Sequence, residues 1–159
     1  MAVVFARVDE RLIHGQVATA WLRKYPVNIV IVVDDESANN SLQKMLLEMA
    51  VSGTMKCVVT TGKDAKAVIE KYAKYKIFLC AKSPAVFLEL LREGVEIPQI
   101  NIGGIYAKEG RKQYYSTIFL DEQTKEDIIA LGEYPCKVEH RTVPQSTEVD
   151  IVKELREGK

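Results

Sequence analysis

The sequence contains few cysteines: Cys57, Cys80 and Cys136 are widely spaced among its 159 residues. No CxxC pair and no Cys/His cluster with metal-ligand spacing occurs, which excludes the zinc-finger and iron–sulfur classes. Cys57 and Cys80 lie in apolar runs, where thiols are usually buried structural side chains. We therefore expect that the chain binds no metal and no cofactor, and that it works in the reducing cytoplasm.

Long apolar runs and a charge excess of either sign are also lacking. The longest apolar run, residues 29–33, has strand length and is far below the ~20 residues that span a bilayer. The N-terminus lacks the basic region and cleavage site of a secretory signal. The 22 basic residues balance the 22 acidic ones, so no nucleic-acid partner is indicated. The length and the 47% hydrophobic content are typical of a single globular domain spanning residues 1–159.

Strand-length apolar runs alternate with segments of helical periodicity, which predicts βαβ units and an open, mostly parallel α/β sheet. Strands are expected at residues 2–8, 28–33, 56–60, 77–80, 98–102, 114–120 and 137–143. Helices are expected at residues 15–24, 42–50, 65–73, 84–93, 124–131 and 149–156. The run at 114–120 alternates like an exposed strand, and one antiparallel strand is expected at an edge of the sheet. For the helix at 124–131, a capping box is expected at Thr124–Asp127.

Periodicity also predicts which side chains are buried. Trp21 is expected in the core. The helix at 42–50 carries apolar residues with the spacing of one buried face, namely Leu42, Met45, Leu46, Met49 and Ala50.

Two polar features are assigned structural positions. His140 lies between Glu139 and Arg141 in an alternating strand, which indicates a solvent-facing edge and no catalytic role. The acidic run at residues 34–36 could bind magnesium, but it also places negative charge at the start of the next helix, and the helix interpretation is favoured.

The loop after the first strand concentrates the side chains that could perform chemistry. It reads Arg7-Val-Asp-Glu-Arg-Leu-Ile-His-Gly-Gln-Val17, and it runs directly into a helix. In open α/β sheets, the working site lies beyond the carboxyl ends of the strands. An acid, a guanidinium and an imidazole, from Asp9, Arg11 and His14, therefore fall together at the place where a site is expected.

These residue types suit reversible phosphoryl transfer. A free imidazole titrates near ~6.5, so His14 can act as a neutral nucleophile, and the phosphoramidate it forms can pass the group onward. Arg11 can neutralise the transferred group, and Asp9 can orient Arg11 or His14. Gly15 and Gln16 lie where free backbone N–H groups and the helix dipole favour an anion. From the residues alone, an ordinary surface histidine beside a structural Asp/Arg pair explains the same spacing, and this alternative stays open.

The wider sequence around this loop resembles the mannose/fructose/sorbose family of phosphotransferase system enzyme IIB. The resemblance rests on residues 7–17, on the Ala18-Thr-Ala-Trp21 that follows and on Ile29-Val-Ile-Val-Val-Asp-Asp-Glu36. Later pieces agree: Lys82-Ser-Pro84, Asn101-Ile-Gly-Gly104 and Val143-Pro144. The match covers nearly the whole chain and is most specific in its first 50 residues.

The resemblance implies a fold with helices on both faces of the sheet and a central first strand. It implies the activity of a protein-N(pi)-phosphohistidine–sugar phosphotransferase, with His14 as phosphohistidine, Arg11 offsetting its charge and Asp9 pairing with Arg11. The turns after the fourth and fifth strands would flank this loop, which makes Lys82, Ser83 and Gly103 second-tier contacts; Ser83 is equally explained as a helix cap.

The partners implied by the family are a IIA phosphoryl donor, membrane IIC and IID subunits that hold the protein at the inner face of the cell membrane, and a sugar. The oligomeric state stays open, and a homodimer is possible. Two other functions are considered: a regulatory module that reports phosphorylation without sugar transfer, and a hydrolase with His14 as general base. The intact set of Asp9, Arg11 and His14 favours the carrier, and the hydrolase lacks a Ser or Cys nucleophile near a strand end.

Three segments depart from the family pattern: Ile105-Tyr-Ala107, Tyr114-Tyr115 and Tyr134-Pro-Cys136. They are expected at the sheet edge and outer rim, away from the His14 loop. They bear on the sugar and on partner fit, which the sequence leaves undetermined, and not on the chemistry.

Overall fold

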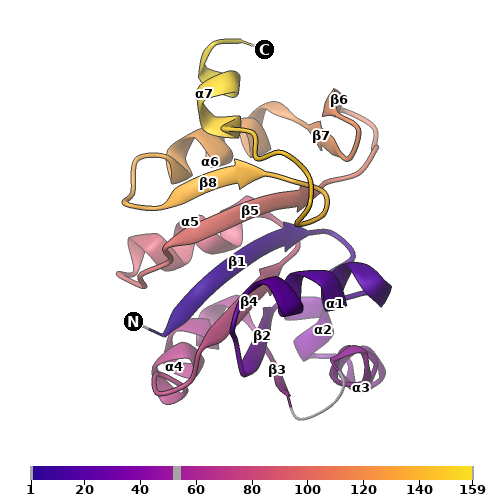
Figure 1. Ribbon diagram of the computed structural model, residues 1–159, viewed down its shortest axis with the longest axis vertical. Helices are drawn as coiled ribbons and strands as arrows, with labels where there is room; N and C mark the ends of the chain where they lie inside the picture. The colour runs from indigo at the N-terminus through magenta and orange to yellow at the C-terminus, as the bar shows by residue number, and fades with distance from the viewer. Residues whose placement is uncertain (1, 52–54, 159) are drawn as a thin grey trace.

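The fold is a six-stranded parallel sheet in the order β3-β2-β4-β1-β5-β8 (Figure 1). A computed structural model describes residues 2–51 and 55–158, with the side chains of residues 16–18 excepted. The strands are β1 (Val3–Asp9), β2 (Ile29–Val33), β3 (Lys56–Thr60), β4 (Ile77–Ala81), β5 (Gln99–Gly104) and β8 (Lys137–His140). β1 pairs with β4 on one side and β5 on the other, so the first strand is central, as expected.

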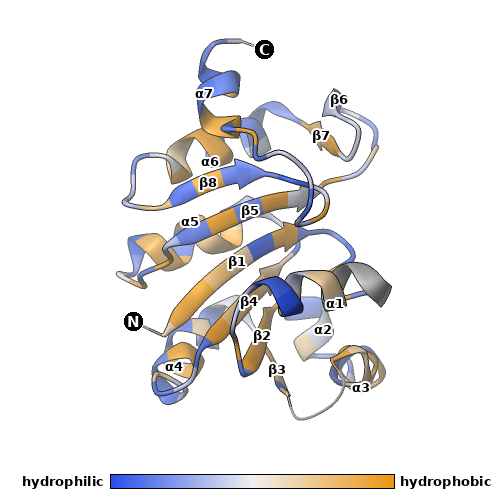
Figure 2. Ribbon diagram, viewed as in Figure 1, coloured by the Kyte–Doolittle hydropathy of each residue, from blue (hydrophilic) through white to orange (hydrophobic). Residues whose placement is uncertain are grey.

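Helices cover both faces of this sheet, as Figures 1 and 2 show. They are α1 (Gly15–Lys24), α2 (Asp35–Ala38), α3 (Ser41–Ala50), α4 (Gly62–Lys71), α5 (Pro84–Arg92), α6 (Glu122–Leu131) and α7 (Ile151–Arg156). Successive side chains of β2 enter opposite cores: Val30 packs in the cluster with Trp21 of α1, whereas Ile31 packs in the cluster with Phe87 of α5. All of β2 is buried because both its faces are covered. Within the described residues, no helix is long and apolar enough to cross a bilayer.

The antiparallel strand lies elsewhere than at the expected edge. The run at 114–120 is divided between two strands, β6 (Lys112–Tyr115) and β7 (Ile118–Leu120), which pair antiparallel as a separate two-stranded sheet. Both edge strands of the main sheet, β3 and β8, are parallel to their neighbours. The reason is topological: the chain reverses between β6 and β7, and α6 then carries it back, so that β8 enters parallel to β5.

Two helix starts test the predicted caps. The acidic run does begin a helix, as expected, but this helix is the short α2, which the sequence did not predict. The carboxylate of Asp34 caps it by accepting the Ser37 N–H at 3.1 Å. The capping box predicted at Thr124 is wrong, because α6 begins two residues earlier, at Glu122. Its N-cap is Asp121, whose carboxylate accepts the Thr124 N–H at 2.7 Å.

The apolar stripe of α3 is exposed, contrary to the prediction that it is buried. The four large side chains of the stripe are 50–70% exposed, namely Leu42, Met45, Leu46 and Met49, and Ala50 is exposed as well. Leu47, outside the predicted stripe, is the residue of α3 that packs with Trp21 in the core. Periodicity correctly identified an apolar face of α3, but the adjacent face, which carries Leu47, is the one that packs in the core.

His140 is buried, so its predicted solvent-facing position is wrong. The chain returns along the outer edge of β8, and Val149 forms an antiparallel bridge with His140 that covers the edge. The imidazole Nδ1 lies 2.6 Å from the carbonyl oxygen of Ile102, and the ring packs on Tyr115 at 4.8 Å between centroids. Because a carbonyl only accepts hydrogen bonds, Nδ1 of His140 carries a proton and donates it to Ile102.

Adjacent leucines of α3 provide a matched test of its orientation. Leu47→Ala should lower the free energy of unfolding by roughly 2–4 kcal/mol because it opens a cavity in the core. Leu46→Ala, the same substitution one residue away on the exposed side, should change it by less than about 0.5 kcal/mol. Urea denaturation of both variants measures the difference, and equal losses would contradict the orientation of α3.

The burial of His140 makes stability depend on pH. Burial lowers the pKa of His140 from its ordinary value, so the unfolded chain takes up this proton at a higher pH than the folded chain. The free energy of unfolding should therefore hold its full His140 contribution above about pH 6.5 and lose it as the pH falls toward the lowered folded pKa.

The measurement is urea denaturation at a series of pH values from about 7.5 down to 5. His140→Gln should show a smaller loss of stability with falling pH than the wild type. An unchanged pH profile in His140→Gln would rule out the buried neutral imidazole as its source.

Candidate functional site

The loop between β1 and α1 is organised by Asp9, the last residue of β1. Its carboxylate oxygen Oδ1 accepts the backbone N–H of Arg11 at 2.9 Å, and its carbonyl accepts the N–H of Leu12 at 2.8 Å. An aspartate that binds the backbone two residues ahead is a common device for turning the chain. The carboxylate itself is fully buried, so this turn is built around a charge.

Two apolar residues fasten the loop to the core. Leu12 adopts the left-handed conformation with φ of 57°, which is uncommon for a residue with a side chain. Leu12 and Ile13 are both buried in the cluster around Trp21, and this packing stabilises the turn. The next residue, His14, is then placed at the N-cap of α1 without a capping bond from its side chain, which leaves the imidazole available.

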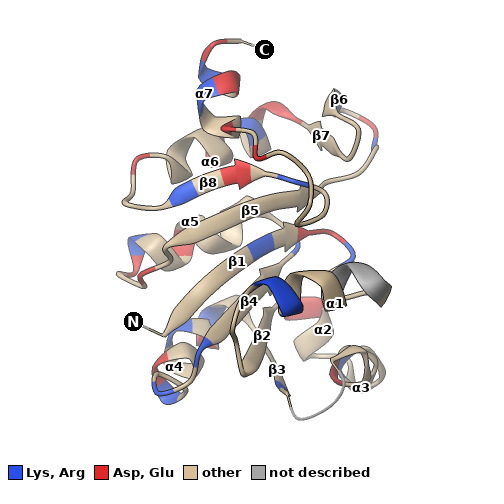
Figure 3. Cartoon of the chain, in the orientation of Figure 1, with Lys and Arg blue, Asp and Glu red and all other residues tan. Residues whose placement is uncertain are grey.

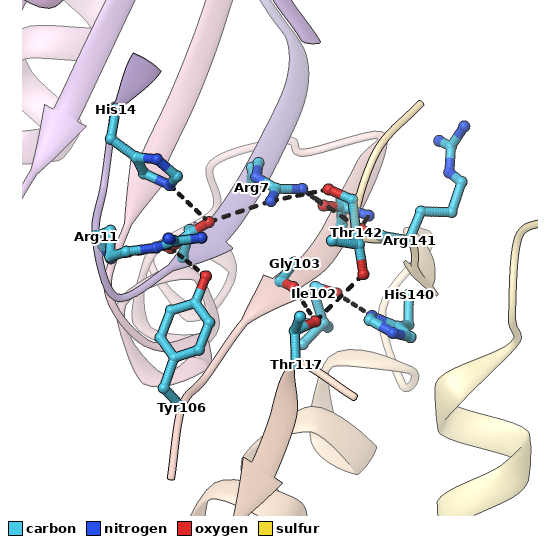
Figure 4. A network of polar contacts seen from close by, with 12 residues as sticks. Arg7, Arg11, His14, Ile102, Gly103, Tyr106, Thr117, His140, Arg141 and Thr142 are labelled. Atoms are coloured by element: carbon cyan, nitrogen blue, oxygen red, sulfur yellow. Dashed lines mark hydrogen bonds and ion pairs between the residues drawn. The ribbon is translucent and has the colours of Figure 1, made fainter. Parts of the chain in front are cut away.

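The three predicted residues do lie together, and Figure 4 shows two of them, His14 and Arg11, beside each other. The Nε2 atom of His14 lies 3.4 Å from Oδ2 of Asp9, and the imidazole is 27% exposed. The Nε atom of Arg11 lies 3.8 Å from Oδ1 of the same carboxylate, and its side chain is 56% exposed. The site therefore consists of a buried carboxylate, Asp9, beside the partly exposed imidazole of His14 and the exposed guanidinium of Arg11.

A residue that the sequence analysis did not select, Arg7, makes the main ion pair with Asp9. Its Nη2 donates to Oδ2 of Asp9 at 3.1 Å, while Nη1 donates to the side chain of Asn101 in β5. It also donates to the backbone carbonyls of Arg141 and Thr142 beyond β8 (Figure 4). Asp9 thus pairs more closely with Arg7 than with Arg11, which leaves the Arg11 guanidinium without a tight partner among the described residues.

A sequence signal for Arg7 existed. Arg7 is a charged residue within the otherwise apolar strand β1, in which Figures 2 and 3 show a hydrophilic, basic band. Its side chain is buried. A charged residue in a strand covered on both faces is rare unless it is paired. Burial lowers the pKa of Arg7, and the carboxylate of Asp9 opposes that shift.

The second-tier residues have structural roles in this conformation. The Nζ atom of Lys82 lies 3.3 Å from Asp34 and 3.8 Å from Glu36, so it is held by the acidic turn after β2. Ser83 is the N-cap residue of α5 and makes no capping bond with its side chain. At Gly103, a Cβ atom would lie 2.3 Å from Cζ of Arg7, so this glycine makes room for the buried guanidinium.

The N-terminus of α1 directly follows its N-cap residue, His14. Gly15 is its first residue and has φ of +49°, a conformation that glycine adopts easily. The first-turn amides, including those of Gly15 and Gln16, carry the positive end of the helix dipole and point out of the N-terminus. The side chain of Gln16 lies outside the described residues.

Tyr106 was expected at the rim, away from the His14 loop, and this prediction is wrong. Its hydroxyl lies 3.4 Å from Oδ1 of Asp9, and its ring centroid lies 4.6 Å from Cζ of Arg11. The reason is an ion pair between loops: Nη2 of Arg111 lies 2.8 Å from Oε2 of Glu10, which holds the segment after β5 against the segment after β1. The departure from the family pattern at this position therefore touches the site itself.

The contact of Gly103 with Arg7 yields a testable expectation. Gly103→Ala should lower the free energy of unfolding by about 1–3 kcal/mol, because the new methyl group overlaps a guanidinium fixed by several hydrogen bonds. Gly62→Ala is the matched control: a Cβ there would meet its nearest atom, Oδ1 of Asp35, at 3.8 Å. Urea denaturation of both variants makes the comparison, and equal stabilities would show that Arg7 is free to move.

Comparison with known proteins assigns the chain to a family. The family model described as the sorbose subfamily IIB component of the PTS, the phosphotransferase system, matches residues 3–159. The fructose-specific EIIB component of Bacillus subtilis (strain 168) is 31% identical over 158 residues, which cover 98% of this chain and 97% of that protein. The mannose-specific EIIAB component of Escherichia coli (strain K12) is 32% identical over 98% of this chain and 50% of its own length.

A solved structure agrees with these relatives. The IIBSor domain of the sorbose permease from Klebsiella pneumoniae matches with a TM-score of 0.94 at 31% identity, covering 100% of this chain and 99% of that domain. The β1–α1 loop with its acid, guanidinium and imidazole thus occurs in a chain that matches this family from residue 3 to residue 159. The chain belongs to the sorbose subfamily of PTS IIB components, the sugar-specific phosphotransfer proteins of that system.

Proposed function

We propose that His14 is the residue that carries the phosphoryl group, accepting it from a phosphohistidine of IIA and passing it to a sugar. The observation that carries the proposal is the 3.4 Å contact between His14 Nε2 and the buried carboxylate of Asp9. An imidazole held by a fixed acid on one nitrogen and exposed to solvent has the geometry of a nucleophile that must meet large partners.

The contact with Asp9 supports one choice of reacting nitrogen. A carboxylate accepts hydrogen bonds, so Nε2 of His14 carries the proton and Nδ1 carries the lone pair. We infer that Nδ1 attacks phosphorus, forming a new P–N bond while the P–N bond to the donor histidine breaks. The Nε2 proton stays on the ring, and Asp9 stabilises the positive charge that develops there. This assignment corresponds to a protein-N(pi)-phosphohistidine intermediate.

Groups that stabilise the transferred phosphoryl surround the imidazole. Arg11 offers a guanidinium whose planar fork matches phosphate oxygens, and it is not consumed by a close ion pair. The amides of Gly15 and Gln16 add the positive end of the α1 dipole. These groups act on charge and position alone, which suits a transfer between two histidines.

Partners follow from the reaction. The donor is a IIA domain or subunit, a proposal supported by the relative named EIIAB, in which the region similar to this chain is half of a longer protein. The acceptor is a sugar presented by membrane IIC and IID subunits, and the protein would then work in the cytoplasm at the inner face of the membrane. The relatives are named for different sugars, fructose and mannose among them, so the sugar of this chain stays open.

The proposal is tested by labelling. The protein is incubated with phosphoenolpyruvate, the general phosphotransferase proteins and a IIA domain, and we expect acid-labile, base-stable phosphate on the wild type. His14→Ala should take up none. His140→Gln, which alters the other histidine, should label normally. The proposal fails if His14→Ala is labelled or if the wild type is not.

The role of Arg11 is tested in the same assay. Arg11→Ala should fold normally, because its side chain is 56% exposed, yet slow transfer by about 100-fold through the loss of charge stabilisation. Arg92→Ala in α5 removes an arginine of similar exposure, 58%, outside the site and should transfer at the wild-type rate. Rapid-quench measurement of label on the protein gives the rates; a wild-type rate in Arg11→Ala would remove Arg11 from the mechanism.

A further inference from the structure

Tyr106, two residues after the end of β5, contacts both Asp9 and Arg11. We propose that Tyr106 is a positioning residue for phosphoryl transfer: its ring supports the Arg11 guanidinium and its hydroxyl fixes the Asp9 carboxylate. This inference rests on the proposed function, in which His14 accepts the phosphoryl group and Arg11 neutralises it.

The ring contact explains how an exposed arginine can be ready for phosphate. Cζ of Arg11 lies 4.6 Å from the Tyr106 ring centroid, and the nearest carboxylate oxygen is 3.8 Å from its Nε. A cation–π contact holds the guanidinium at the ring without a second ion pair, so the guanidinium can still bind phosphate oxygens bidentately. A long side chain held in this way loses less conformational freedom when the phosphoryl group arrives.

The hydroxyl of Tyr106 contacts the second charged residue of the pair, Asp9. The Tyr106 hydroxyl lies 3.4 Å from Oδ1 of Asp9, the oxygen that also accepts the Arg11 N–H. Burial and the charge of Asp9 raise the pKa of Tyr106, so the hydroxyl stays protonated and donates. The opposite oxygen, Oδ2, faces His14 and Arg7. Tyr106 therefore completes the set of donors that hold the carboxylate in one orientation.

The backbone of Tyr106 is held in place as firmly as its ring. Its N–H donates to Oε1 of Glu10 at 2.8 Å, and its carbonyl accepts from Nη1 of Arg111 at 2.7 Å. Arg111 in turn makes two hydrogen bonds to the Glu10 carboxylate, at 3.0 and 2.8 Å. Glu10 follows Asp9 directly, so Tyr106 is tied to the same turn that carries the site.

Gly104 provides the space for this arrangement. A Cβ atom at this position would lie 2.2 Å from the Tyr106 hydroxyl oxygen, closer than any side chain could be tolerated. The second glycine of the Asn101–Gly104 segment thus leaves room for the tyrosine, as the first leaves room for Arg7.

The experiment combines Tyr106 and Arg11 substitutions in a double-mutant cycle. Transfer from phosphorylated IIA to the protein is followed by rapid quench, and kcat and KM for IIA are measured. Tyr106→Leu should lower kcat about fivefold, the effect of losing one cation–π contact of ~1 kcal/mol, and leave KM unchanged. Tyr106→Phe keeps the ring and should stay within about twofold of wild type.

The cycle separates positioning from general stability. In the Arg11→Ala background, Tyr106→Leu should lower kcat by no more than the roughly twofold allowed for Tyr106→Phe, because the effect of the ring passes through Arg11. Tyr75→Leu, the same substitution at a 46% exposed tyrosine outside the site, is the control and should match wild type. If Tyr106→Leu does not fold, judged by urea denaturation, Tyr106→Met takes its place in the cycle.

Two results would overturn the inference: a wild-type kcat in Tyr106→Leu, or an equal loss with and without Arg11. Either result leaves the proposed function standing as long as wild-type protein is labelled and His14→Ala is not. Absence of label on His14 in the wild type would overturn the proposed function itself, so the two failures are distinguishable.

Discussion

The buried ion pair between Arg7 and Asp9 is the interaction on which the site depends. Both side chains lie at the end of the central strand β1, almost without contact with solvent. Burying a carboxylate alone is costly, and removing one partner of a buried pair leaves an uncompensated charge. Asp9 can therefore organise the β1–α1 turn, and hold Nε2 of His14, because Arg7 lies beneath it in the sheet.

Arg7 also ties the site to strands distant in the sequence. It donates to the side chain of Asn101 in β5 and to two backbone carbonyls that follow β8. The Asn101 amide in turn donates to the Glu139 carboxylate at 3.1 Å. The glycine at 103 is needed where this guanidinium crosses β5. A polar network in which every member is paired has few alternative arrangements, so it fixes the orientation of the carboxylate more firmly than a surface pair would.

What the sequence predicted correctly was local, and what it predicted wrongly depended on the path of the chain. The parallel sheet and the meeting of Asp9, Arg11 and His14 follow from periodicity and from one short loop. The exposure of the α3 stripe and the burial of His140 follow from which segment covers which edge. Periodicity carries no information about that, because an apolar face looks the same whether or not a neighbour covers it. Tyr106 reaches the site through the ion pair of Glu10 with Arg111, 101 residues apart.

Under the proposed function, the division between buried and exposed charge would allow the site to gain and lose the charge of a phosphoryl group repeatedly. A phosphoryl group on His14 brings negative charge close to Asp9, and two like charges at this distance would repel each other if nothing compensated the carboxylate. Arg7 compensates it permanently, out of reach of solvent and partners. Arg11, exposed and loosely held, is then free to respond to the phosphoryl group alone. A reversible carrier needs two separate arginines. If one arginine had to pair with both the Asp9 carboxylate and the phosphoryl group, its contact with the carboxylate would weaken whenever the phosphoryl group was present.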